Sequence, residues 1–229
     1  MRAFIRLHII VEGQTEERFV KDTLALHLGA FQITTDVRRV LTSRDRRKHK
    51  SYRGGLLNYE KVKRDIQSWL KEDRHQESRF TTMFDLYALP DSFPNYKEAK
   101  AIPDPYQRVE CLEKAFQDDI GDPRFVPYIQ LHEFETLVLA NPANLEYEYF
   151  EHENAIKILQ NGLEQAGGNP ELINDTSTTA PSKRILAVIP EYEKVNVGAY
   201  IAGINGVDFL KITCHHFSCW LETLEQLSI

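Results

Sequence analysis

Five carboxylates follow three apolar segments of the sequence. Glu12 comes directly after an apolar run, with Glu16 one helical turn later; Asp85 ends a second run, and Glu133 and Glu135 follow a third. The carboxyl ends of parallel strands meet at one edge of a sheet, where open α/β sheets bind ligands. Clustered carboxylates repel one another unless a cation neutralises them, and oxygen ligands suit Mg²⁺ or Mn²⁺. The sequence therefore predicts a divalent metal site formed by these five acids.

Several candidate site residues also have a simpler interpretation. Glu16 in the first turn of a helix is favourable against the helix dipole without any metal. A lone Asp after a strand, such as Asp85, is commonly a turn former or helix cap. Lys183 follows a polar loop, where it either stabilises phosphate charge at the site or is an ordinary solvated lysine. His132 has three possible roles: it orients a metal ligand, acts as a general base, or simply starts a helix.

One basic loop stands out in an otherwise acidic chain. Its cations are close enough in sequence to bind a nucleic-acid backbone, and a solvated surface loop is the equally weighted alternative. The cations concerned are Arg44, Arg46, Arg47, Lys48, Lys50 and Arg53.

Hydrophobic patterning predicts the elements that must position these residues. Strands are expected at about 4–11, 33–41, 80–84 and 124–131, with helices after each of them, at about 16–28, 59–70, 103–120 and 136–139. This β-α-β-α order indicates an α/β fold, a mostly parallel three-layer sheet with helices on both faces.

The last third of the sequence has a different character. Residues 146–163 and several shorter segments after 182 favour amphipathic helices. We expect an α/β core over residues 1–142 and a helical region over 143–229, packed on that core as one compact unit.

Composition restricts the function classes. The formal net charge of −6 gives no overall electrostatic case for nucleic acid, so such a site must be local. The three cysteines form neither a zinc signature nor an even disulfide set, which favours free thiols in a reducing cytoplasm. We expect no signal peptide and no membrane span, because no apolar run is long enough. Whether the chain forms a homo-oligomer stays open.

Several motifs together resemble a bacterial family known as a domain of unknown function. It is grouped with Toprim-like proteins and is often encoded beside an ABC- or AAA-type ATPase. The motifs are Val11-Glu-Gly-Gln-Thr-Glu16, Asp85-Leu-Tyr-Ala-Leu-Pro90, His132-Glu-Phe-Glu135, Pro181-Ser-Lys-Arg184 and His215-His-Phe-Ser-Cys-Trp-Leu221.

The resemblance implies a Toprim-like fold and roles for individual residues. Toprim domains carry a Glu after the first strand and an Asp-x-Asp after a later one, matching Glu12 and Asp85. By similarity to overcoming-lysogenization-defect nucleases, Glu16 and Glu135 are further metal ligands and Lys183 is the catalytic lysine. Tyr87 departs from the pattern, because it stands where the second Asp is expected. This departure puts a two-metal arrangement in question, and Glu133 is the residue available to compensate.

The implied function is a Mg²⁺- or Mn²⁺-dependent nuclease acting on DNA or RNA. Its implied role is as the effector of an anti-phage defence system, with an ATPase as partner. A non-catalytic interaction subunit of an ATPase complex is the alternative from another class. Phosphoryl or nucleotidyl transfer on a small molecule is a third hypothesis that the same metal site supports.

Overall fold

A single parallel sheet forms the centre of the protein. The computed structural model describes residues 4–40, 58–173 and 179–228. The strand order is β2-β1-β3-β4, and β5 also pairs with β3. All of these pairings are parallel. The strands are β1 (Ile5–Val11), β2 (Ile33–Arg39), β3 (Ser78–Asp85), β4 (Phe125–Val126) and β5 (Ile129–Gln130).

The fourth predicted strand is interrupted in the middle. Pro127, which has no backbone N–H, separates β4 from β5. The Thr82 hydroxyl bridges the break, since it accepts from the Tyr128 N–H and donates to the Tyr128 carbonyl, both at 2.9 Å. The chain thereby stays in register, and Asp85 pairs with Gln130 at the ends of β3 and β5.

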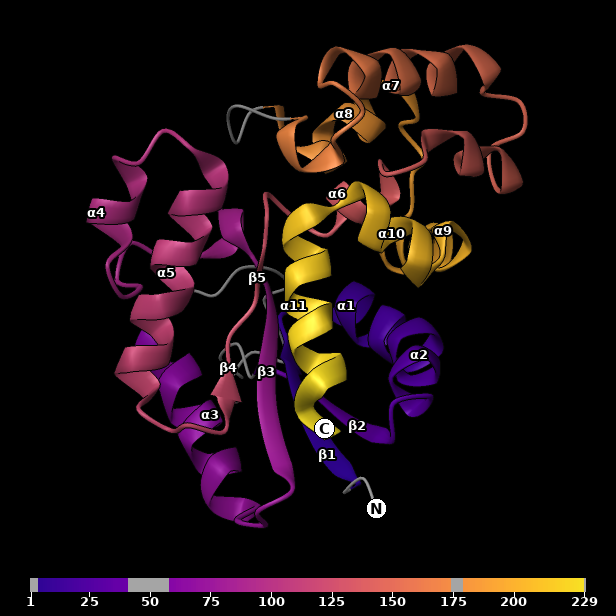
Figure 1. Cartoon of the computed structure of the whole chain (residues 1–229). Coiled ribbons are helices and arrows are strands. Elements are labelled where there is room, and N and C mark those ends of the chain that lie inside the picture. The colour runs from indigo at the N-terminus through magenta and orange to yellow at the C-terminus, as the bar shows by residue number, and fades with distance from the viewer. Residues whose placement is uncertain (1–3, 41–57, 174–178, 229) are drawn as a thin grey trace, which may run out of the picture.

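Helices cover both faces of the sheet, as Figure 1 shows. The helix that follows β1 is continuous from Gln14 to Gly29, with a π-helical turn at Val20–Leu24 between α1 and α2. It lies on one face with α11, while α3 and α5 lie on the other. The bounds are α1 (Gln14–Phe19), α2 (Ala25–Gly29), α3 (Tyr59–Glu72), α4 (Tyr96–Lys100), α5 (Pro105–Ile120) and α11 (His215–Glu225).

The remaining helices lie mainly beyond the carboxyl ends of β3 and β5 (Figure 1). They are joined by short 3₁₀ turns and one π-helical turn, Lys194–Gly198. Their bounds are α6 (Glu135–Val138), α7 (Glu153–Gln165), α8 (Pro181–Val188), α9 (Ala199–Asn205) and α10 (Val207–Thr213). Among the described residues, none of the helices could cross a lipid bilayer.

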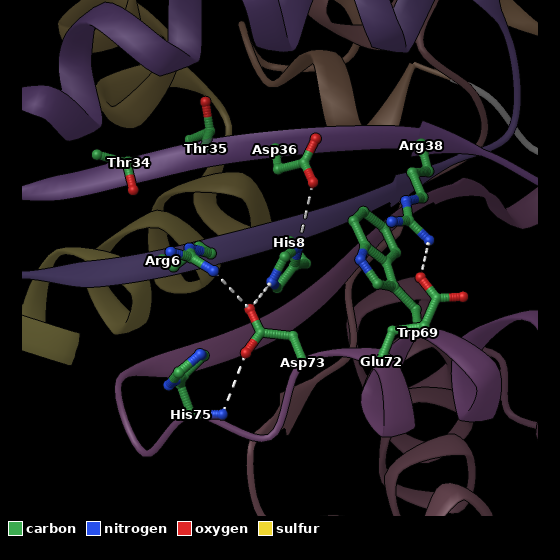
Figure 2. Close-up of a pocket in the computed structure, with 10 residues that line it drawn as sticks. All are labelled: Arg6, His8, Thr34, Thr35, Asp36, Arg38, Trp69, Glu72, Asp73 and His75. Atoms are coloured by element: carbon green, nitrogen blue, oxygen red, sulfur yellow. Dashed lines mark hydrogen bonds and ion pairs between the residues drawn. The ribbon is translucent and has the colours of Figure 1, made fainter.

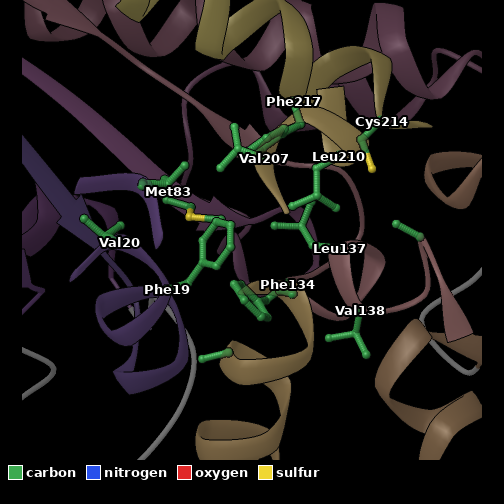
Figure 3. Close-up of a cluster of buried hydrophobic side chains, with 14 of the residues drawn as sticks. Phe19, Val20, Met83, Phe134, Leu137, Val138, Val207, Leu210, Cys214 and Phe217 are labelled. Carbon is green, nitrogen blue, oxygen red and sulfur yellow. The ribbon is translucent and has the colours of Figure 1, made fainter. Parts of the chain in front are cut away.

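One hydrophobic cluster joins early and late parts of the sequence (Figure 3). Phe19 of α1 packs against Phe134, with ring centroids 5.5 Å apart, and Phe217 of α11 lies in the same cluster. A second cluster on the opposite face joins α3 and α5 to the sheet. The predicted α/β class, with a parallel sheet, helices on both faces and a helical C-terminal part, is confirmed.

Candidate functional site

The turn after β1 places the first two acids. The Gly13 N–H donates to Glu16 Oε2 at 2.8 Å, so Glu16 does cap its own helix. A Cβ at position 13 would stand 2.9 Å from the same oxygen, so a side chain there would displace the Glu16 carboxylate. Burial raises the pKa of Glu16, and the Glu133 carboxylate adds to this rise.

Asp85 ends β3 in the middle of the acidic site. Its side chain is buried, and Oδ1 has no hydrogen-bond partner within the described parts of the chain. Burial raises the pKa of Asp85 well above its ordinary value, and the neighbouring carboxylates of Glu16 and Glu12 raise it further. The ends of β1 and β3 therefore bring these three acids into one electrostatic environment.

The loop after β5 supplies the other two acids. Glu133 accepts a hydrogen bond from the Ser182 N–H in the first turn of α8, and Glu135 begins α6. Glu135 is fully buried, and burial together with nearby Glu133 raises its pKa to about 7. Glu135 also contributes to the raised pKa of Asp85, which connects this loop to the end of β3.

A lysine that the sequence analysis did not identify lies among these acids. Lys194 Nζ is 2.9 Å from Glu135 Oε2 and 3.4 Å from Glu133 Oε2. Burial alone would lower the pKa of Lys194, but the surrounding carboxylates, Glu135 foremost, raise it. The predicted lysine, Lys183, is exposed on α8, one residue after Ser182. No local motif marks Lys194, because it reaches the site through tertiary packing of its π-helical turn.

The donor chemistry of the site fits a hard divalent cation. Besides Asp85 Oδ1, the buried Glu135 Oε1 makes no hydrogen bond to the described chain. Carboxylate oxygens of this kind are the ligands that Mg²⁺ and Mn²⁺ take. Within residues 4–40, 58–173 and 179–228, however, no three His, Cys, Asp or Glu side chains already have the spacing of a metal centre. In this arrangement Lys194 offsets part of the negative charge of Glu133 and Glu135.

Two further predicted features have different outcomes. His132 uses both ring nitrogens: Nδ1 is 2.9 Å from the Tyr87 hydroxyl, and Nε2 is 2.8 Å from the Glu171 carbonyl. It thus contacts a protein group through each nitrogen and presents neither of them to a metal. The basic loop lies outside the described residues, so its predicted nucleic-acid contacts stay a prediction.

A separate pocket of about 460 Å³ lies beside β1, β2 and the end of α3 (Figure 2). His8 lies at its centre, with Nε2 2.8 Å from Asp73 and Nδ1 3.5 Å from Asp36. Arg6 also contacts Asp73, and the Arg38 guanidinium lies 4.2 Å from the Trp69 ring centroid. Its charged lining residues pair largely with one another, and it contains none of the five acids.

Fold and site together define an α/β protein with an acidic site at the carboxyl edge of a parallel sheet. A family model described as "Domain of unknown function (DUF4276)" matches residues 11–225, and the chain belongs to this family. Neither the curated proteins nor the solved structures contain a significant match.

Proposed function

We propose that this protein is a Mg²⁺-dependent, Toprim-like nuclease that hydrolyses phosphodiester bonds of DNA or RNA. The observation that carries this proposal is the convergence of acids from three strand ends around buried Asp85. So many carboxylates in one buried site are costly without a cation, and Lys194 offsets only part of their charge. The Toprim-like resemblance of the motifs supports the same conclusion.

The five acids would hold the cation. Glu12 and Asp85 come from the two central strands, and Glu16, Glu133 and Glu135 complete the set. Bound Mg²⁺ supplies a water of lowered pKa and offsets phosphate charge. Mn²⁺ would serve in the same way.

Lys194 would act on the substrate as well. Its side chain is 44% exposed, and its Nζ lies 2.9 Å from Glu135 Oε2. A lysine at the mouth of the site can stabilise the charge that develops on the phosphate in the transition state. Lys183, nearby on α8, is the second candidate for this role.

The biological setting is inferred from family resemblance. An ATPase partner that restrains or delivers the nuclease, and a role in cytoplasmic anti-phage defence, are the expected context. The alternative is a non-catalytic interaction subunit. The Lys194 contacts with Glu133 and Glu135 favour this alternative, since they offset part of the acidic charge without a metal.

Cleavage and metal binding separate these functions. We expect wild type to bind Mn²⁺ by titration calorimetry and to cut DNA or RNA with Mg²⁺ or Mn²⁺, alone or with its ATPase. Glu12→Gln and Asp85→Asn should lose both properties. Asp118→Asn, an exposed acid on α5, is the matched control for loss of one charge. Metal binding without cleavage of any nucleic acid would reject the nuclease and leave small-molecule phosphoryl transfer. Absence of metal binding would favour the interaction subunit.

A further inference from the structure

We propose that Tyr87 is a positioning residue that, through His132, fixes the loop carrying Glu133 and Glu135 at the metal site. The inference rests on the proposed metal-binding function. It gives a role to the tyrosine that stands where Toprim-like sequences are expected to carry a second aspartate.

Tyr87 contacts His132 at two points. The Tyr87 N–H donates to the His132 carbonyl at 3.0 Å, and the Tyr87 hydroxyl lies 2.9 Å from His132 Nδ1. The two ring centroids are 5.5 Å apart. The Tyr87 backbone therefore fixes the position of His132, and the Tyr87 side chain fixes the orientation of the His132 ring.

His132 has a backbone conformation that needs such support. Its φ of +64° lies in the left-handed region, which L-residues with a side chain seldom adopt. Strained residues of this kind persist only where the surroundings hold them, and they gather at functional sites. The turn at His132 directs the chain from β5 into Glu133 and α6.

The opposite side of His132 is anchored as well. Its Nε2 donates to the Glu171 carbonyl at 2.8 Å, which leaves Nδ1 as the acceptor for the Tyr87 hydroxyl. The Glu171 carboxylate is fully buried and accepts from the backbone N–H groups of His216 and Phe217 at the start of α11. His132 is thus held between Tyr87, just after β3, and Glu171, which is itself bonded to the start of α11.

This chain of contacts connects acids from different strands. Tyr87 is two residues beyond Asp85, and His132 directly precedes Glu133. Holding Tyr87 against His132 therefore fixes the acid of β3 relative to the acids that follow β5. Outer partners that orient metal ligands commonly change metal affinity about 10- to 100-fold when they are removed.

Two explanations of Tyr87 predict opposite results for one substitution. If Tyr87 is only a missing ligand, Tyr87→Asp restores a carboxylate and tightens Mn²⁺ binding. If Tyr87 is a positioning residue, Tyr87→Asp breaks the His132 contact and weakens binding. Tyr87→Phe removes only the hydroxyl and should weaken Mn²⁺ binding roughly tenfold.

Titration calorimetry with Mn²⁺ and thermal melting without metal test the inference. His132→Asn serves as a second variant, because Asn adopts the left-handed region readily and keeps the turn. It should also weaken Mn²⁺ binding, with a melting temperature within a few degrees of wild type. Tyr59→Phe is the matched control, since the Tyr59 hydroxyl bonds Asp119 on α5 and is not part of the Tyr87–His132–Glu171 contacts; its Mn²⁺ affinity should equal that of wild type.

The outcomes separate this inference from the function on which it rests. Unchanged affinity in Tyr87→Phe, or tighter binding in Tyr87→Asp, would overturn the positioning role while the metal site stands. Mn²⁺ binding that follows the expected order without nucleic-acid cleavage would support the positioning role and reject the nuclease. A wild-type protein that binds no Mn²⁺ would overturn both.

Discussion

Glu135 is the acid whose protonation is set most clearly by its surroundings. It is fully buried at the start of α6, and its pKa is raised from an ordinary value of 4.5 to about 7 despite the contact with Lys194. Burial disfavours the charged form more than one partly exposed ammonium can offset. Without metal, the folded protein therefore holds a proton that the unfolded chain has already released at pH 6.

This shift predicts that the metal-free protein loses stability with rising pH. Because the folded pKa lies above the unfolded one, stability falls as pH rises from about 4.5 to 7. Glu135→Gln should reduce the difference in unfolding free energy between pH 5 and pH 8 by about 1 to 3 kcal/mol, measured by urea denaturation with chelator. Glu146→Gln, an exposed acid, is the control. An equal pH dependence in Glu135→Gln and wild type would contradict the raised pKa.

The two lysines make different predictions for catalysis. Lys194 contacts two site acids, whereas Lys183 is exposed on α8. Loss of a group that stabilises transition-state charge commonly lowers turnover about 10²- to 10³-fold. We expect Lys194→Ala to lower the cleavage rate by that factor and Lys183→Ala to lower it less. A larger loss of rate in Lys183→Ala than in Lys194→Ala, measured in single-turnover assays, would support Lys183 as the catalytic lysine.

At the scale of elements, local signals in the sequence account for most helices and strands. Pro105 at the start of α5 and apolar residues at helical spacing predict that helix almost to the residue. Helix α4 was missed, because it has only five residues and directly follows a segment rich in turn-forming residues. Helix α7 begins at Glu153, later than predicted, since the 3₁₀ turn Pro142–Tyr147 and irregular chain precede it.

The cap of α5 gives a prediction at this scale. The Asp104 side chain accepts a hydrogen bond from the Gln107 N–H at 2.8 Å, so it satisfies a donor that the helix leaves open. Asp104→Ala should lower the unfolding free energy by about 1 kcal/mol in urea denaturation. Asp118→Ala, at an exposed position near the end of the same helix, should change it by less than about 0.5 kcal/mol. Equal effects would show that the cap contributes nothing.

For the whole molecule, the parallel topology made the acidic site partly predictable. Strand ends that carry Glu12, Asp85 and Glu133 must share one edge once the strands are parallel. The Lys194 contacts and the Tyr87–His132–Glu171 connection depend on how distant segments pack, and no periodicity or motif encodes that packing. The sequence alone could therefore place the carboxylates but not the groups that hold and neutralise them.

Long-range packing also predicts that the molecule melts as one unit. Trp220 of α11 stacks on Tyr128 with centroids 4.2 Å apart, and its Nε1 donates to Thr81 of β3 at 2.9 Å. Phe217→Ala would leave a cavity in the cluster of Figure 3 and should cost about 3 to 5 kcal/mol. Calorimetry should show a single transition at lower temperature. Two separate transitions in wild type would contradict the shared core.

The contact of Glu171 with α11 also determines when the site can form during synthesis. The acids at the ends of β1, β3 and β5 leave the ribosome before His216 and Phe217. The N–H groups of these two residues hold the Glu171 carboxylate. The Glu171 carbonyl in turn holds His132. A nascent chain that has all five carboxylates still lacks this anchor. If the proposed nuclease activity holds, the protein would thus stay inert beside the ribosome's own RNA until α11 has left the ribosome.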